Sequence, residues 1–270
     1  MQLPSINSAV RVFLICGLCV GLSSLALGQN GQAILVSAHK ADVWQPPAGL
    51  PFTIPAGHPL NPATQTDHLV ALCFDDGPFN DALNPHRGTE DLLDILKAYQ
   101  VKASFFVIGR HVKHFRASFD RMVAEGHEID NHTYSHRELT KMSPEEAMAD
   151  IQRNADTIAA IYKGPVRFFR PPQWQITPEL KLTIKAKFGY TIMTAPNDHD
   201  VHDWGVKCTV NSIFNNAVKL ESNDNFVMVL HCDGPEVGNK RSLIKILDKF
   251  LTDGYRFVTL GEFADRGLLR

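Results

Sequence analysis

The sequence predicts an α/β fold built on parallel strands, arranged either as a barrel or as an open sheet. Apolar runs typical of buried strands alternate with helical patterns from His68 onward, without a block of consecutive strands. Polar residues also follow several of the expected strands at the point where each strand ends. In a β/α barrel these strand ends form one face, so the second observation favours a barrel with a site at its mouth.

Seven strands are expected, each an apolar or aromatic run bounded by turn residues or by a helical pattern. They are 68–74, 103–108, 127–130, 167–170, 190–194, 225–231 and 255–260. The first, HLVALCF, is almost wholly apolar, which is typical of a strand buried on both faces.

Six helices are expected between these strands. They are 90–99, 115–125, 143–162, 177–188, 210–220 and 240–253. The second ends at Gly126, and the third has the clearest start, with Ser143 as N-cap, Pro144 in the first turn and Glu146 completing a capping box.

The composition of the 270-residue chain is that of a folded domain. Apolar residues make up 44% and charged residues 21%, and 27 basic against 29 acidic side chains give a net charge of −2. This balance, without a run of lysine or arginine, argues against a nucleic-acid partner or an anionic membrane surface.

The N-terminus has the pattern of a secretory leader. An uncharged run from Val12 to Gly28 follows Arg11 and ends in small residues, as in a cleaved signal peptide. The run is shorter than the ~20 residues of a membrane-spanning helix and contains glycine and serine, so cleavage is favoured over an uncleaved anchor. We therefore expect a secreted, periplasmic or cell-envelope protein with no stable membrane partner after cleavage.

The expected organisation is a signal peptide at 1–28, a proline-rich arm at 29–66 and one domain at 67–270. Six prolines between residues 45 and 62, without helical or strand periodicity, indicate that the arm is extended. The sequence leaves open whether the arm lies along the domain or is disordered.

Three cysteines lie beyond the leader, at Cys73, Cys208 and Cys232. An odd number cannot all pair, so disulfides are not the framework of the fold. In an exported protein Cys208 and Cys232 could form one bridge, and the alternative with all three reduced fits equally well.

The candidate metal ligands follow the first and third expected strands. Asp75 and Asp76 are adjacent carboxylates directly after the first strand, and His132 and His136 are four residues apart after the third. Alone, these would be an Asp-Gly turn and a pair of surface histidines. Together at one rim, two imidazoles and one carboxylate form a three-ligand site with open positions, which is the catalytic pattern for zinc.

Other polar residues lie at the same rim. Arg170 ends the fourth strand, where it could neutralise and orient Asp75; Asp203 precedes Trp204 in a loop after the fifth strand; and His231 ends a later strand. Each has an ordinary explanation as a strand-end or loop residue. Their shared position favours a site.

These segments, in this order, resemble the five motifs of the polysaccharide deacetylase family, the NodB-homology carbohydrate esterases. The similarity runs from His68 to Ala264 and includes the stretches Asp91–Gly109 and Glu125–Leu139. The resemblance implies a distorted (β/α) barrel with about seven parallel strands and one bound divalent metal ion. Zn²⁺ is the first expectation for this ion, and Co²⁺ or another divalent ion is the alternative. It also implies a hydrolase that removes N-acetyl groups from an acetylated amino-sugar polymer, chitin-like or peptidoglycan.

By motif match, the resemblance implies a role for each polar residue. The ligands would be Asp76, His132 and His136. Asp75 would be the general base that takes a proton from the attacking water, held by Arg170. His231 would be the general acid that protonates the departing amine, with Asp203 tuning it.

The resemblance also implies a substrate-binding set, Pro172, Gln173, Trp174, Trp204 and Val229. The backbone N–H of Gln173 would bind the oxyanion, and Trp204 with Val229 would line the pocket for the acetyl methyl group. The family usually has an aromatic residue and then glycine where Gln173 and Trp174 stand, so Trp174 could serve as a sugar-stacking surface. This chain also departs from the family at Cys73, at Val229, where leucine is usual, and at Cys232, which separates His231 from Asp233 although the aspartate usually follows the histidine directly.

The departures concern the acetyl pocket and leave the metal and acid–base set complete. Two alternatives therefore remain open: an O-deacetylase such as an acetylxylan esterase, and a catalytically silent carbohydrate-binding relative. Oligomeric state is not indicated by the sequence.

Overall fold

The computed structural model of the chain divides into two compact units, Met1–Val43 and Trp44–Arg270. The residues that it describes are 25–27, 33–35, 52–63, 68–80, 88–194, 199–204, 208–222, 224–233 and 236–269. In the first unit, β1 (Leu25–Leu27) pairs antiparallel with β2 (Ala33–Leu35). The rest of the expected signal peptide lies outside the described residues, and none of the described helices is long and apolar enough to cross a membrane.

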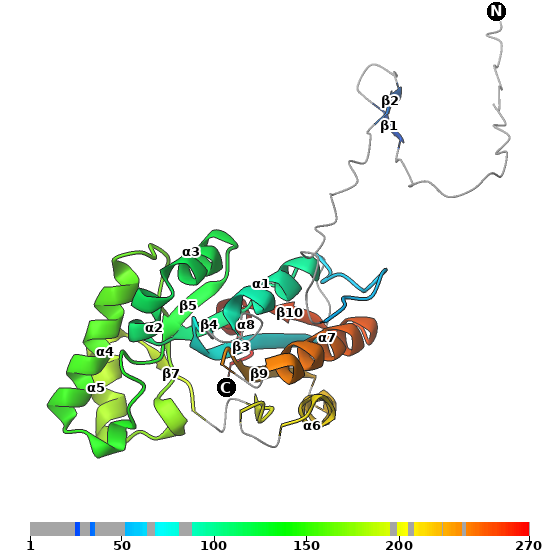
Figure 1. Ribbon diagram of the computed structural model, residues 1–270. Coiled ribbons are helices and arrows are strands. Elements are labelled where there is room, and N and C mark those ends of the chain that lie inside the picture. Colours follow the sequence, from blue (N-terminus) through cyan, green and yellow to red (C-terminus); the bar gives the residue numbers. More distant parts are fainter. Residues whose placement is uncertain are drawn as a thin grey trace, which may run out of the picture. The chain divides into compact units, whose positions relative to one another are not determined.

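The second unit is built on a sheet of eight parallel strands (Figure 1). The strands are β3 (Leu69–Gly77), β4 (Ser104–Val107), β5 (Glu128–Asn131), β6 (Phe168–Phe169), β7 (Thr191–Ile192), β8 (His199–Asp200), β9 (Asn225–His231) and β10 (Arg256–Val258). Seven of them follow the order β7-β6-β5-β4-β3-β9-β8, and β10 pairs with β3 beside this path. The sheet is curled into a half-barrel, which confirms the predicted α/β class, and its eight strands are the seven expected ones together with β8.

Strand β3 lies at the centre of the sheet. It pairs with β9 along Leu69–Asp75, while β10 pairs with its first residues and β4 with its last, so these two share its other edge. Alternate β3 side chains enter two apolar clusters: Val70, Leu72 and Phe74 enter one, and Leu69, Ala71 and Cys73 the other. Both faces of the strand are therefore buried, which explains its unbroken apolar run.

Helices cover the sheet. They are α1 (Thr89–Ala98), α2 (Gly109–His114), α3 (Arg116–Ala124), α4 (Pro144–Ala159), α5 (Pro178–Phe188), α6 (Val210–Lys219), α7 (Glu236–Thr252) and α8 (Leu260–Asp265). Contacts join α4, α2, α3, α1, α7 and α6 in that spatial series, and α5 packs against β7 (Figure 1). Short 3₁₀ turns lie at Leu139–Lys141, Pro172–Trp174 and Leu220–Ser222.

The observed elements differ from the expected ones at three places. The expected helix 115–125 is α3, and α2 precedes it, separated by a break at Phe115 (φ −112°, ψ 49°). Strand β8 was not expected, and the last expected strand ends at Val258 because Thr259 caps α8. Asp203 therefore follows β8 rather than the fifth expected strand, and β8 lies beside β9 at the opposite end of the path from β7.

The described part of the proline-rich arm, residues 52–63, lies along the domain. Phe52 is buried in the larger apolar cluster. The Asn61 side chain donates to the carbonyl of Phe257 and accepts from its N–H, both at 2.9 Å, as a neighbouring strand would. The sequence left open whether the arm packs on the domain or is disordered, and residues 52–63 pack on the domain surface.

The capping box expected at Ser143 is confirmed. Glu146 N–H donates to Ser143 Oγ at 3.2 Å, and Ser143 N–H donates to Glu146 Oε2 at 3.0 Å. We expect Ser143→Ala to lower the free energy of unfolding by about 1 kcal/mol, because the N-terminal amide of α4 loses its acceptor. Denaturant titration measures this, with Ser143→Thr as the control that keeps a hydroxyl; an unchanged midpoint for the alanine variant would contradict the prediction.

Candidate active site

A cavity of about 550 Å³ opens at the carboxyl ends of the strands. Eight of the residues expected from the sequence line it: Asp75, Asp76, His132, His136, Gln173, Trp174, Trp204 and His231. The other four, Arg170, Pro172, Asp203 and Val229, are buried next to these in the chain or in contact with them. The structure therefore gathers residues that are up to 156 positions apart, since Asp75 pairs directly with His231 across β3 and β9.

Asp76, His132 and His136 form a three-sided cluster. Oδ1 of Asp76 lies 3.0 Å from Nε2 of His136 and 3.3 Å from Nε2 of His132. All three candidate ligand atoms lie within 4.8 Å of one another. Ligands of a tetrahedral zinc ion are spaced roughly 3.3 Å apart, so the cluster has the dimensions of such a site.

The hydrogen bonds around this cluster favour a cation within it. Nδ1 of His132 lies 2.7 Å from the carbonyl oxygen of Arg170, so it must carry the ring proton and donate. In the neutral imidazole Nε2 then presents a lone pair toward Asp76 Oδ1, a buried oxygen that accepts no hydrogen bond from the residues that the structure describes. Two lone pairs facing each other repel unless a proton or a metal ion lies between them. The donor set therefore fits a divalent ion such as Zn²⁺.

The backbone of the cluster is held in unusual conformations. Asp76, Thr133 and His136 have φ values of 66°, 67° and 57°, in the left-handed region that side chains rarely adopt. His111 Nδ1 lies 3.0 Å from the carbonyl oxygen of Asp76, and the Thr133 hydroxyl accepts from the N–H of His136. Such strain persists only where surrounding contacts impose it, and it gathers at functional sites.

Two buried asparagines fix the loop that carries the histidines. Asn131 Oδ1 accepts from the N–H of Thr133 and from Nδ2 of Asn154, both at 2.9 Å. Asn154 Nδ2 also donates to the carbonyl of Val107, which ties the loop to β4. This network links the α4 helix to the position of His132.

Asp75 forms a buried ion pair with Arg170. Arg170 Nη1 donates to Asp75 Oδ1, and both residues are at most 3% exposed. The guanidinium lies 3.7 Å from the centre of the Phe106 ring and 5.2 Å from that of Trp174. The aromatic rings leave the charge little room to move, so the orientation of Asp75 is fixed.

His231 forms the second buried pair of the site. Its Nδ1 lies 2.7 Å from Asp203 Oδ1, and its backbone N–H donates to Asp203 Oδ2 at 2.9 Å. Burial alone would lower the pKa of His231, but the Asp203 carboxylate, with other carboxylates of the cavity, raises it to about 10. The imidazole is therefore held in its protonated, proton-donating form.

Burial alone would also raise the pKa of Asp76, but the imidazoles of His132 and His136 beside it hold that pKa well below its usual range. Asp76 is thus kept as a carboxylate, the form that binds a metal ion.

The loop after β6 shapes one wall of the cavity. Gln173 and Trp174 adopt φ values of 55° and 61°, two consecutive left-handed residues, and both line the cavity. Pro172 is the buried first residue of the same turn. Val229 is also fully buried, and it belongs to the apolar cluster inside the sheet rather than to the cavity lining.

Three polar residues at the site were not identified from the sequence. Asp200 and Asp233 line the cavity, and His111 contacts the backbone of Asp76. Asp200 lies in the same segment as Asp203, and its three-residue spacing from that carboxylate is the signal that could have indicated it. Cys73, Cys208 and Cys232 form no disulfide, so the alternative with all three reduced holds.

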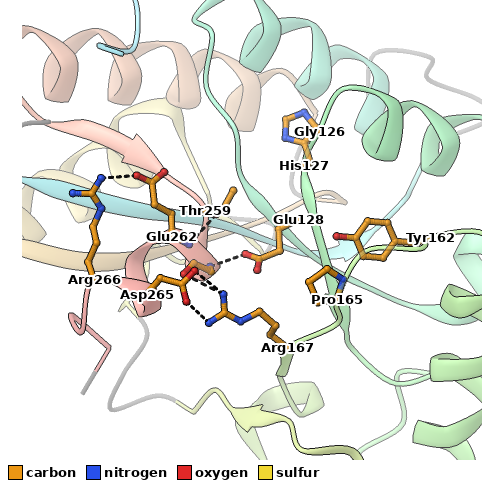
Figure 2. A pocket seen from close by; sticks show the side chains of 11 residues that line it. Gly126, His127, Glu128, Tyr162, Pro165, Arg167, Thr259, Glu262, Asp265 and Arg266 are labelled. Carbon is orange, nitrogen blue, oxygen red and sulfur yellow. Dashed lines mark hydrogen bonds and ion pairs between the residues drawn. The ribbon is translucent and has the colours of Figure 1, made fainter. Parts of the chain in front are cut away.

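A second hollow lies at the amino-terminal ends of β5 and β6, beside α8 (Figure 2). Its charged side chains pair with one another: Arg167 with Asp265 at 2.7 Å and Arg266 with Glu262 at 2.8 Å. Glu128 accepts from the N–H of Gly261. These ion pairs satisfy the charges that line the hollow. Neither of the two candidate metal-binding clusters found among the described residues lies there.

The sequence model for polysaccharide deacetylases matches residues 63–193. The chain is 34% identical over 216 residues to a peptidoglycan-N-acetylglucosamine deacetylase of Bacillus cereus, covering 77% of this chain and 93% of that protein. It is 30% identical to a chitin deacetylase of Colletotrichum lindemuthianum, covering 77% and 84%.

Among solved structures, the fold is similar to a family 4 acetyl xylan esterase of Clostridium thermocellum in complex with a cobalt ion. That match has a TM-score of 0.64 and 32% identity, and covers 74% of this chain and 92% of that one. Together with the strand order and the residues gathered at the cavity, these similarities show that the chain belongs to the polysaccharide deacetylase family.

Proposed function

We propose that this protein is an exported, metal-dependent hydrolase that removes N-acetyl groups from an amino-sugar polymer or oligomer, chitin-like or peptidoglycan. The observation that carries the proposal is the arrangement of one Asp–His–His cluster, one Arg-held carboxylate and one Asp-held histidine around a single cavity. Two of the relatives are a peptidoglycan and a chitin deacetylase, which support this substrate class.

Asp76, His132 and His136 would hold the metal ion, with Zn²⁺ first and Co²⁺ as an alternative. When bound, such an ion supplies Lewis acidity, which makes water nucleophilic near neutral pH and polarises an acetyl carbonyl. The related esterase structure is a complex with a cobalt ion, which supports a divalent ion as the cofactor of this chain.

Asp75 would act as the general base. Arg170 holds one of its oxygens, and the second, Oδ2, lies 4.0 Å from Nε2 of His132, beside the metal cluster. A carboxylate fixed in this way can take a proton from a water molecule that attacks the acetyl carbon.

His231 would act as the general acid. An amine leaves an amide only if its nitrogen is protonated, and His231 keeps a proton because Asp203 stabilises the imidazolium. The backbone N–H of Gln173 would stabilise the oxyanion, beside Pro172. The acetyl group and sugar would contact Trp174 and Trp204, which line the cavity, whereas Val229 lies behind its wall.

Acetate release tests the proposed function. The purified protein, loaded with zinc or cobalt, is incubated with chitooligosaccharides, peptidoglycan fragments and acetylxylan. We expect release from the first two substrates. Release from acetylxylan alone would identify an O-deacetylase instead, and no release from any of the three would favour a silent carbohydrate-binding protein.

Replacement of Asp203 is expected to change the pH dependence of the reaction. His231 has a raised pKa, so its acid form is present below about pH 10 and is lost above it. In Asp203→Asn, burial remains while the stabilising charge is gone, so the alkaline limb of kcat/KM should move down by about 1 to 3 pH units. A pH–rate profile on a chitooligosaccharide measures this; an unmoved limb would show that His231 does not set it.

A further inference from the structure

Trp204 is the most exposed indole of the described chain, and its position is fixed by a carboxylate. The residue is 55% exposed, yet its Nε1 donates to Asp200 Oδ2 at 2.7 Å. The Asp200 side chain is only 10% exposed. An exposed indole N–H can hydrogen-bond to water, so Trp204 does not need a protein acceptor. Burying the Asp200 carboxylate costs free energy, so its hydrogen bond to Trp204 points to a role.

The Asp200 carboxylate is itself anchored on both sides. Asp200 is the last residue of β8 and pairs with Val229 of β9, which fixes its backbone. Its Oδ1 accepts from the N–H of His202 at 2.6 Å, in a turn where His202 has a φ of 57°. The His202 ring meets the Trp204 ring edge-on, with centroids 6.0 Å apart.

We propose that Asp200 is a positioning residue that holds the Trp204 indole as a rigid wall of the cavity, against which one sugar ring of the glycan binds. This rests on the proposed function for the identity of the ligand. Both residues line the cavity that contains Asp75 and His231. A pyranose presents C–H groups on one face, and a flat, exposed indole offers it apolar area while the N–H edge stays hydrogen-bonded.

The advantage of holding the indole is entropic. A mobile tryptophan must be immobilised when the sugar binds, and this ordering opposes binding, whereas a ring already in place loses little. Removing Asp200 should therefore weaken glycan binding without removing any group that reacts.

Asp200 has a competing role to exclude. Asp200, Asp203 and His231 present atoms within 4.8 Å of one another, so Asp200 could act through the charge of His231 instead. The two roles differ in their readouts. A role through Trp204 changes KM, whereas a role through His231 changes kcat and its pH dependence.

The first measurement needs no substrate. The chain has three tryptophans, and in ¹⁵N-labelled protein Trp204→Phe assigns the indole N–H signal of Trp204. In Asp200→Ala we expect this signal to shift and its exchange with solvent to become about 10-fold faster, as a charge-assisted hydrogen bond is lost. An unchanged signal would overturn the proposal whether or not the protein is a deacetylase.

The second measurement uses chitotetraose. Asp200→Ala and Trp204→Phe should each raise KM about 3- to 10-fold, because both remove the same hydrogen bond, while kcat falls less than about 2-fold. In a Trp204→Ala background, Asp200→Ala should add less than about 2-fold, since its partner is already gone. Asp120→Asn, which removes a half-exposed carboxylate on α3, is the matched control and should change neither the signal nor KM.

The outcomes separate the proposal from the proposed function. A lower kcat with a moved alkaline limb, persisting in the Trp204→Ala background, would assign Asp200 to His231 and overturn the positioning role. A signal that shifts as expected with unchanged KM would overturn the sugar wall. If the wild-type protein releases no acetate from chitotetraose, the proposed function fails. The sugar wall is then tested by calorimetry, in which Asp200→Ala should raise the Kd for chitotetraose about 3- to 10-fold. An unchanged Kd would overturn it.

Discussion

Asp75→Asn is expected to lower kcat/KM for N-acetyl hydrolysis by about 10²- to 10⁴-fold while the protein retains its metal ion. The amide side chain keeps the shape of Asp75 and can still contact Arg170, which donates to this position from a buried pocket. It cannot accept a proton from water. Acetate release and metal content by elemental analysis, measured on the same gel-filtered sample, give the two quantities.

Asp76→Asn is expected to show the reverse order of effects. Asp76 Oδ1 lies within 3.3 Å of both imidazole Nε2 atoms, and its replacement by a neutral amide removes the only carboxylate of the described three-residue cluster. Metal affinity should fall more than about 100-fold, and activity should fall with it. Excess zinc should restore part of the activity of Asp76→Asn and none of that of Asp75→Asn.

Asp156→Asn is the control for both variants, since it removes an exposed carboxylate on α4 that accepts a hydrogen bond from Gln152. It should leave metal content and turnover unchanged. Equal loss of metal from Asp75→Asn and Asp76→Asn would contradict the division of roles between the two adjacent carboxylates.

The longer elements of the fold could be predicted because their burial repeats along the sequence. Strand β3 is buried on both faces and appears as a continuous apolar run, and α4 has its start marked by Ser143 and Glu146. Strand β8 could not be predicted in this way, because two residues, one histidine and one aspartate, have no measurable period. It forms only because β9 offers a free edge there, which is a property of the assembled sheet.

The candidate site was predictable for a different reason. Parallel strands all end on one face, so polar residues after several strands must meet, and Asp76 and His132 do. The interactions that hold them could not be foreseen. His111 contacts Asp76 from the six-residue helix α2, and Asp200 contacts Trp204 in a turn after an unexpected strand, so neither interaction follows from the periodicity of a long element.

His231→Ala is expected to reduce amide cleavage much more than ester cleavage. The departing amine must receive a proton, which His231 carries because the Asp203 carboxylate holds its pKa at about 10 against the effect of burial. The aryloxide that departs from an aryl acetate is stable enough to leave without a proton. We expect kcat on an N-acetylated chitooligosaccharide to fall about 10²- to 10⁴-fold, and on an aryl acetate less than about 10-fold.

The same preparation, assayed on both substrates with equal metal content, separates loss of the proton donor from loss of the fold or of the ion. His114→Ala, at an exposed position of α2, controls for removal of an imidazole and should change neither rate. If both substrates lose activity equally, His231 stabilises a step common to amides and esters, such as formation of the tetrahedral intermediate, and is not the acid that protonates the leaving nitrogen. The comparison thus tests the one role in this site that depends on the leaving group, because the metal cluster and Asp75 serve both reactions alike.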